Sequence, residues 1–129
     1  MVASLDSRLK AVLAARAALE KQAEDVLVID LRALSSVTDF FVICTGTSTR
    51  HLDALKDHLE AQLEQQGQPP WHVEGPGPEP HGSAHPAAWH WILMDCGDIV
   101  VHLFDAPART FYQLERLWAD APRLSLQAG

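Results

Sequence analysis

The stretch from Trp91 to Phe104, WILMDCGDIVVHLF, constrains the fold more than any other part of the chain. Hydrophobic residues fill most positions on either side of Cys96-Gly97-Asp98, which predicts two strands joined by a tight turn. Successive side chains of a strand point to opposite faces, so both faces of this hairpin are largely apolar. Such a hairpin belongs inside a sheet that is covered on both sides. Its polar exceptions are Asp95, Asp98 and His102, and polar residues that interrupt a core pattern often mark function.

The rest of the chain predicts helices and strands in alternation. Apolar periodicity, capping residues and Gly or Pro breaks indicate a helix at 4–23, strands at 25–32 and 40–45, a helix at 49–66, a short strand at 71–75, the hairpin, and a helix from 105 that Pro122 closes. We therefore predict an α/β fold with a mixed central β-sheet and helices on both faces. The length indicates a single domain over residues 1–129, with a core at about 5–122.

Each predicted helix has an apolar stripe that should face the sheet. The stripes are Leu5, Leu9, Val12, Leu13 and Leu19 in the first helix, Leu52, Leu55, Leu59 and Leu63 in the second, and Phe111, Leu114, Leu117 and Trp118 in the third. Residues 75–88, GPGPEPHGSAHPAA, are too rich in proline and glycine for regular structure, so we expect a flexible loop. The tail that follows Pro122 should fray.

Composition excludes several classes of protein. With 47% hydrophobic and 21% charged residues, the chain is typical of soluble globular domains. No apolar run approaches the roughly 20 residues that span a bilayer, and charged residues interrupt any signal-peptide pattern near the N-terminus, so we expect a cytoplasmic protein without membrane contact. The net charge of −7 argues against direct DNA binding and favours a basic protein partner.

Neither the cysteines nor the histidines predict a metal or a cofactor. Cys44 and Cys96 are too few for a disulfide framework or a four-cysteine zinc site. Three of the seven histidines, His81, His85 and His90, lie in or beside the 75–88 loop without the spacing that pre-forms a zinc site on a helix. His102 lies within the hairpin, where a half-buried structural histidine is the alternative to a functional one.

The segment TGTSTR at 45–50 leads from a strand into a helix, and two interpretations of it are open. Free amides at a helix N-terminus can hold a phosphate, whereas Thr47 or Ser48 can equally serve as an ordinary helix cap. Nucleotidyltransferases have a similar turn, but they also need paired carboxylates for magnesium, and no such pair follows here. Ser35-Ser36 lacks the glycine-flanked elbow of hydrolases. The sequence therefore does not predict an enzyme.

Four sequence blocks resemble the ribosomal silencing factor family, also called Iojap. They are SSVTDFFVI, TGTSTRH, DxGDxVVH and YxLERLW, in the family's order and spacing, within 25–51, 91–104 and 111–118; the similarity covers roughly residues 5–122. The long GPGPEPHGSAHPAA segment departs from the family pattern, in which a shorter acidic turn is usual.

The resemblance implies a nucleotidyltransferase-like α/β fold without that enzymatic activity. It also implies binding to the large ribosomal subunit through its protein numbered fourteen, which blocks joining of the small subunit and represses translation when nutrients are short. It implies that the binding surface centres on the hairpin, at Trp91, Asp95, Cys96, Gly97, Asp98 and His102. A second set of motif residues, without an assigned role, is Ser35, Ser36, Thr38, Asp39, Thr45, Gly46, Thr47 and Ser48.

Alternatives from other classes remain open at this point. The chain could be a nucleotide-using enzyme at the TGTS turn, or a homodimeric scaffold in which an exposed hairpin face pairs with itself. For Trp91 itself, the alternative to a binding residue is an ordinary core residue whose loss unfolds the domain.

Overall fold

A computed structural model describes residues 6–74 and 91–124, and the expected loop at 75–88 lies outside these residues. The described residues form one six-stranded sheet in the order β3-β4-β5-β2-β1-β6. Its strands are β1 (Glu24–Asp30), β2 (Phe40–Gly46), β3 (His72–Glu74), β4 (Trp91–Asp95), β5 (Ile99–Asp105) and β6 (Arg123–Leu124). β2 and β5 pair in parallel and the other neighbours are antiparallel, so the sheet is mixed, as predicted.

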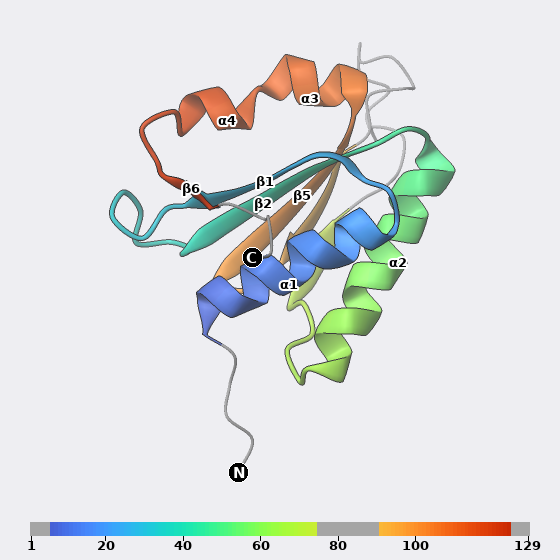
Figure 1. Cartoon of the computed structure of the whole chain (residues 1–129), viewed down its shortest axis with the longest axis horizontal. Helices are drawn as coiled ribbons and strands as arrows, with labels where there is room; N and C mark the ends of the chain where they lie inside the picture. The colour runs from blue at the N-terminus through green and yellow to red at the C-terminus, as the bar shows by residue number, and fades with distance from the viewer. Residues whose placement is uncertain (1–5, 75–90, 125–129) are drawn as a thin grey trace.

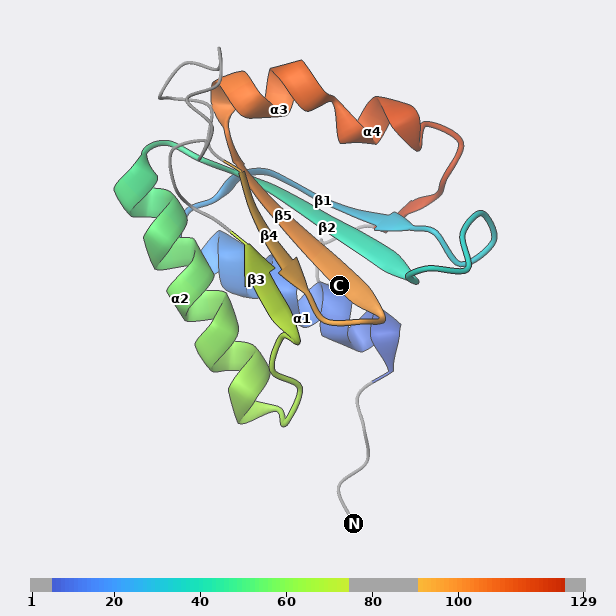
Figure 2. The ribbon, with the colours of Figure 1, turned by 180° about the vertical axis from the view of Figure 1, so that it is seen from behind.

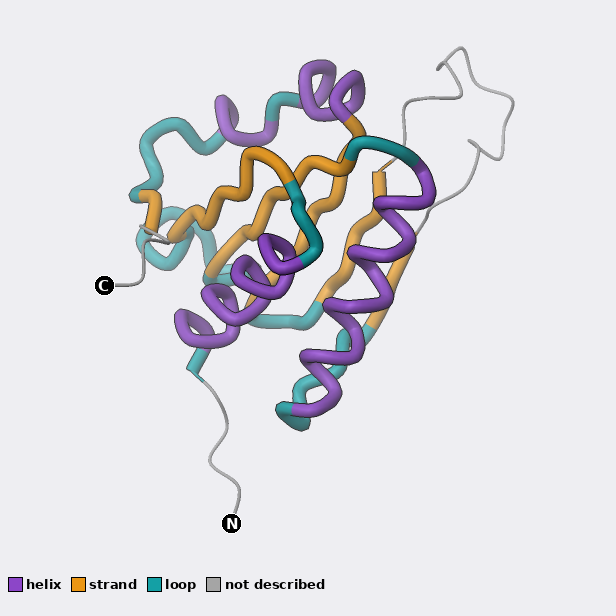
Figure 3. The backbone as a smooth tube through the Cα atoms, turned by 45° about the vertical axis from the view of Figure 1, so that its right-hand side comes forward, coloured by secondary structure: helices purple, strands orange, loops and turns teal. Residues whose placement is uncertain are grey.

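Helices lie on both faces of this sheet. Helices α1 (Ser7–Glu20) and α2 (Thr49–Gln65) cover one face, and α3 (Ala106–Tyr112) and α4 (Leu114–Leu117) lie over part of the other (Figures 1 and 3). The face below α1 and α2 buries Val28, Phe40, Val42, Cys44, Ile92, Met94, Val101 and Leu103; the face below α3 and α4 buries Ile29, Leu31, Ile43 and Phe104. This arrangement confirms the predicted fold class.

The hairpin lies inside the sheet, as its two apolar faces predicted. β4 is flanked by β3 and β5, and β5 is flanked by β4 and β2. The turn between them is Cys96–Asp98, in which Gly97 has a φ of +85°, a conformation that favours glycine. A Cβ atom at Gly97 would also lie 2.9 Å from the ring of Trp71, which packs over the turn.

The second helix follows its prediction closely. Leu52, Leu55, Leu59 and Leu63 are all fully buried. Ser48 caps its first turn by accepting a hydrogen bond from the amide of His51, and Gly67 follows its end with a φ of +71°. The bonds from the Gly67 and Gln68 amides to the carbonyls of Glu64 and Leu63 satisfy the last turn.

The predicted stripe of α1 is only partly correct: Leu13 packs against the core, Leu5 lies outside the described residues, and Leu9 and Leu19 point away from the core. Leu9 and Leu19 are 52% and 45% exposed, while the alanines between them are buried. The buried face consists of Lys10, Ala11, Ala14, Ala15, Ala17 and Ala18. Small side chains let the helix backbone approach the sheet. Lys10 lies on the same buried face, where its ammonium group donates to Asp98, to Gln68 and to the Cys96 carbonyl. Both sides of this helix are apolar in sequence, so periodicity did not distinguish them.

The final helix also differs from its prediction. Asp105 caps it and Pro107 lies in its first turn, as expected. However, Gln113 adopts a left-handed conformation, φ 47° and ψ 50°, which separates α3 from α4. The break places Phe111 (55% exposed) and Leu117 (72% exposed) outside the core, and Tyr112 packs on it with Leu114 and Trp118. Residues 123–124 pair with β1 as β6, so the expected fraying does not begin at Arg123.

Candidate binding surface

The structure divides the hairpin residues between two regions. Asp95, Cys96, Gly97 and Asp98 lie at the turn, at one end of the sheet. Trp91 lies at the other end of β4 and pairs with Phe104, and His102 pairs with Leu93 between the two ends. Cys96 and His102 are buried, at 3% and 4% exposure, whereas the other four residues are partly accessible. The hairpin motif is therefore not one continuous surface patch.

At the turn, the two aspartates already have partners within the chain. The Asp95 carboxylate accepts a hydrogen bond of 2.8 Å from the Gly97 amide. The Asp98 carboxylate forms an ion pair of 2.8 Å with Lys10, whose side chain is only 4% exposed. The Lys10 ammonium group also donates to the Cys96 carbonyl and to Gln68, each at 3.3 Å. These bonds fasten α1 to the turn, a role that the sequence motif did not reveal.

The loop that carries Ser35, Ser36, Thr38 and Asp39 packs against the same turn. The amide of Asp39 donates to the Asp98 carbonyl at 2.9 Å, and the Asp39 carbonyl accepts from Leu31 at 2.8 Å. Ser35 accepts a hydrogen bond from the amide of Val37, and Thr38 is buried. The structure thus brings two of the motif blocks together at one end of the sheet.

The other block, Thr45 to Ser48, lies at the opposite end and forms the capped start of α2. The amide of Thr47 donates to Nδ1 of His51 at 2.9 Å, and Nε2 of His51 donates to the Lys21 carbonyl at 2.7 Å. A Cβ atom at Gly46 would lie 2.7 Å from Leu52, so the close packing of α2 on β2 requires glycine there. These contacts favour the capped-helix interpretation over a phosphate site, because the amide of Thr47 is already used.

Trp91 belongs to an aromatic cluster where α3 packs on the sheet. Its ring centroid lies 4.7 Å from that of Tyr112, 5.2 Å from Phe104 and 5.7 Å from His102. Its indole N–H donates to Nδ1 of His102 at 3.1 Å. Burial lowers the pKa of His102 from 6.5 to about 3, so this imidazole is neutral and accepts the indole bond. Trp91 is half-buried, with one side packed in the cluster.

Beside Trp91, the sheet carries apolar side chains that belong to neither helix-covered core. Trp91, Leu93 and Asp95 are alternate residues of β4, so their side chains share one face of the sheet. Val100 of β5 pairs with Asp95, and directly opposite residues point to the same side, so Val100 shares this face too. Leu93 and Val100 are half-buried and neither lies in a core cluster. Helices α3 and α4 lie over β1, β2 and one end of β5, and leave this part of β3 and β4 uncovered by either helix (Figure 2). We call Trp91, Leu93, Val100, His72, Glu74 and Asp95 the open face.

The open face has an apolar centre and an acidic rim. Its central residues are Trp91, Leu93 and Val100. Glu74 of β3 pairs with Leu93, and His72 pairs with Asp95. The exposed side chains of His72 and Glu74 contact each other, with Nε2 of His72 3.0 Å from Oε2 of Glu74. Leu93 and Val100 were missing from the predicted site, although the alternation of the two strands places them beside Trp91.

Comparisons with known proteins bear on the family to which the chain belongs. The sequence model of a family described as ribosomal silencing factor during starvation matches residues 4–128. The chain belongs to the ribosomal silencing factor family. It is 37% identical to the ribosomal silencing factor of Bacillus subtilis (strain 168), over 91% of each chain. It is 33% identical to the mouse protein named mitochondrial assembly of ribosomal large subunit protein 1, over 77% of this chain and 40% of that one.

A solved structure shares the fold of this silencing-factor chain. The crystal structure of a Chromobacterium violaceum protein superimposes with a TM-score of 0.75 and 26% identity, and the match covers 97% of this chain and 95% of that one. Among residues 6–74 and 91–124, no group of three or more His, Cys, Asp or Glu side chains is placed to hold a metal ion. None of the helices in these ranges is long and apolar enough to cross a membrane.

Proposed function

We propose that this protein represses translation by binding the large ribosomal subunit in the cytoplasm, through the ribosomal protein numbered fourteen, and blocking its joining with the small subunit. The open face is the observation that carries the proposal. The family membership and the printed name of the mouse relative, which refers to the large subunit, support the choice of partner. The family's description adds that repression operates during starvation.

The chemistry of the open face suits a basic protein surface. Interface hot spots are enriched in tryptophan, and they lie at apolar centres whose surroundings exclude water. Trp91 with Leu93 and Val100 supplies such a centre: all three are half-buried, Trp91 packs against the core below α3 and α4, and Leu93 and Val100 lie outside both cores. The rim carboxylates of Glu74 and Asp95 and the net charge of −7 attract basic partners and speed association with them.

We propose no catalytic step. Exclusion of the small subunit requires only that the bound protein occupies space at the joining surface. Two groups in the sequence motifs that a catalytic site could use are bound within the chain instead. The Thr47 amide donates to His51, and the Asp98 carboxylate forms an ion pair with Lys10. The names of the two relatives reported above refer to ribosomal silencing and to assembly of the large ribosomal subunit, which are not enzymatic activities.

Co-sedimentation with isolated large subunits tests the proposal. Leu93→Glu places a charge at the apolar centre and should weaken binding at least tenfold, which corresponds to about 1.4 kcal/mol. Leu117→Glu is the matched control, because Leu117 is 72% exposed on α4, away from the open face. Thermal melts of both variants check folding. Unchanged binding by a folded Leu93→Glu variant would refute the open face as the contact.

Trp91→Ala extends the test to the aromatic cluster. Loss of a buried tryptophan anchor typically removes about 2 kcal/mol or more of binding, a roughly thirtyfold loss. Because Trp91 also packs on Tyr112 and Phe104, this variant is measured only after a melt shows that it folds.

The same variants separate large-subunit binding from self-association. Sedimentation velocity on the free protein reports whether a homodimer forms. If Leu93→Glu dissociates a dimer while large-subunit binding is unchanged, the open face is a surface between copies of this chain and the ribosomal assignment of that face is wrong.

A further inference from the structure

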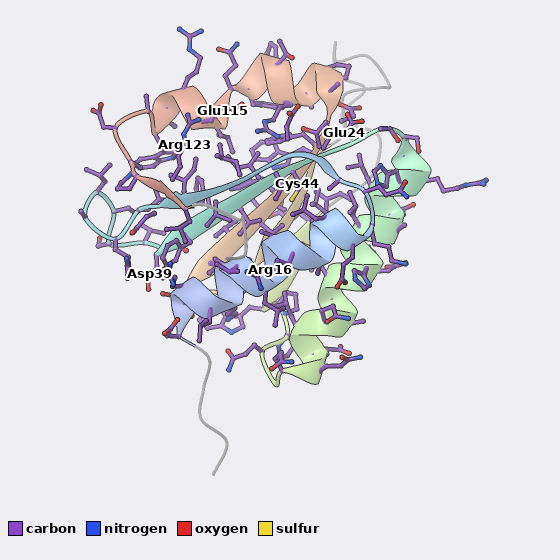
Figure 4. All side chains as sticks on the ribbon, viewed as in Figure 1. Arg16, Glu24, Asp39, Cys44, Glu115 and Arg123 are labelled. Carbon is purple, nitrogen blue, oxygen red and sulfur yellow. The ribbon has the colours of Figure 1, made fainter. Side chains whose placement is uncertain are left out.

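A cleft of about 550 Å³ lies toward the sheet edge opposite β3 and β4, and residues of β1, β6, α3 and α4 line it. Three of the chain's ten basic residues line it, Arg109, Arg116 and Arg123. Glu115 on α4 and Arg123 on β6, both labelled in Figure 4, line the cleft from two different elements. Its other lining residues are Asp25, Val26, Leu27, Thr110 and Gln113.

Arg109 lines this cleft and connects the elements around it. Its Nη1 donates to the Asp25 carbonyl at 2.9 Å and to the Thr45 hydroxyl at 2.8 Å. Its Nε donates to Oε2 of Glu115 at 3.0 Å. Because the Glu115 carboxylate balances Arg109, the charge of this guanidinium is already matched.

The other two guanidinium groups are not matched in this way. Arg123 forms no side-chain hydrogen bond or ion pair with any residue in 6–74 or 91–124. Within the same described ranges, Arg116 donates only to the side-chain oxygen of Gln113, at 3.1 Å. Both residues are exposed, and a guanidinium offers a fork of N–H donors that fits a phosphate group. Two such guanidinium groups at one cleft, in a chain of net charge −7, indicate that the cleft binds an anion.

A carboxylate oxygen of a residue that lines the same cleft adds a second requirement for the ligand, a hydrogen-bond donor. Oε1 of Glu115 is buried and has no hydrogen-bond partner among the described residues. A carboxylate oxygen can only accept a hydrogen bond, and leaving such an atom buried without a donor is costly. An occupant that satisfies both features carries a phosphate for the arginines and a hydroxyl or N–H donor for Glu115. A ribonucleotide has both groups, since its ribose hydroxyls lie close to its phosphates.

The backbone on both walls of the cleft is strained. Gln113 and Asp25 adopt positive φ values of 47° and 49°, which are uncommon for residues other than glycine. The pairing of β1 with β2 is also irregular between Glu24 and Leu27, and such bulges recur beside functional sites. Strain on this scale persists where the surrounding structure holds it, frequently at ligand sites.

We propose that this cleft binds the phosphate ester of a ribonucleotide, with Arg116 and Arg123 on the phosphate and Glu115 on a ribose hydroxyl. The site goes beyond the proposed ribosomal contact and lies apart from the open face. Its ligand is either a strand of RNA or a free nucleotide. The acidic remainder of the chain repels RNA beyond the cleft, but at physiological salt this repulsion is screened over about 8 Å. Short oligonucleotides are therefore the appropriate probes.

Fluorescence anisotropy with a labelled RNA hexamer tests the site on the intact chain, without ribosomes. Arg116→Gln/Arg123→Gln should weaken binding at least tenfold and reduce the slope of log Kd against log salt by about 1.4, the value for two phosphate contacts on a single strand. Arg8→Gln/Arg50→Gln removes the same charge from exposed positions outside the cleft and should change neither quantity. Equal effects of the two double variants would overturn the proposal. Failure of the wild-type chain to bind both the RNA hexamer and a labelled AMP would also overturn it.

A charge change in the opposite direction sharpens the test. Asp25 is an exposed carboxylate that lines the cleft, so Asp25→Asn should strengthen binding, and asparagine tolerates its positive φ. Glu24→Gln is the control, since Glu24 is exposed on the same strand but does not line the cleft. Stronger binding by Glu24→Gln and not by Asp25→Asn would place the ligand elsewhere.

Competition identifies the source of the phosphate. Displacement by unlabelled RNA at far lower concentration than by AMP assigns the cleft to RNA, and equal displacement assigns it to free nucleotides. A DNA hexamer of the same sequence should compete more weakly, because it lacks the 2′-hydroxyl; equal competition would refute the role given to Glu115. Because no ribosome is present, failure here leaves the large-subunit assay to stand or fall separately.

Discussion

The stability of this protein should fall as the pH is lowered, because His102 cannot accept a proton in the folded state. The imidazole is 4% exposed and lies against Phe41, with ring centroids 4.5 Å apart. Its Nδ1 accepts the indole N–H of Trp91, and protonation would place two donors against each other. Burial lowers the pKa of His102 from 6.5 to about 3.

The sign and size of the effect follow from that shift. Between pH 6.5 and about 3 the unfolded chain binds a proton at His102 that the folded chain does not bind, so the free energy of unfolding decreases as pH falls. Each pH unit within this window costs up to about 1.4 kcal/mol. Two units below 6.5, the loss from this residue is about 2–3 kcal/mol, a large part of the roughly 5–15 kcal/mol that stabilises a typical domain.

Urea unfolding at several values between about pH 7 and about pH 4.5 measures this loss, with His102→Asn as the reference. Asparagine can accept the indole hydrogen bond through its side-chain oxygen and does not titrate. Carboxylates that titrate in the same range contribute to both proteins, so the difference between the two curves isolates His102. Parallel curves would show that the buried histidine is protonated in the folded state, or that its site is wetter than the structure indicates.

Three further substitutions test contacts that hold the fold. Gly97→Ala should lower the free energy of unfolding by about 1–3 kcal/mol in urea melts, because alanine at a positive φ is strained and its Cβ would meet Trp71; no change would contradict the turn geometry. Lys10→Met should lower the free energy of unfolding by about 2 kcal/mol. This value is smaller than for a fully buried ion pair because the Asp98 side chain is 37% exposed to solvent. Asp105→Ala should cost about 1 kcal/mol by removing the cap of α3, whereas Asp105→Asn should retain most of it.

The local sequence pattern was sufficient to predict burial where one side of a helix is clearly more apolar than the other. The leucines of α2 recur on a single face, so their burial was evident from spacing. In α1 the alanine face and the leucine face are both apolar, and the choice depends on the pairing of Lys10 with Asp98, which are 88 positions apart. The left-handed Gln113 and the pairing of β6 with β1 likewise depend on tertiary contacts, since glutamine carries no turn signal and a two-residue strand has no pattern.

The candidate site shows the same limit. The strand alternation of the hairpin correctly separated its two faces, and Trp91 was correctly placed on the face with Leu93. The extent of helix cover could not be predicted, because it depends on the break at Gln113 and on where α4 ends. Only the assembled sheet shows that β3 and β4 extend beyond that cover (Figure 2).

The hairpin motif combines residues with two kinds of role, and this determines how binding should be tested. Gly97 and Asp98 shape the turn and anchor α1, and Cys96 and His102 are buried, so substitutions at these positions act first on folding. A loss of ribosome binding in such variants would therefore carry little information about contact. Leu93 and Val100 lie outside the predicted site set, yet they are half-buried beside Trp91 and outside both cores. If the open face binds the large subunit, substitutions at these two positions should separate binding from folding most cleanly.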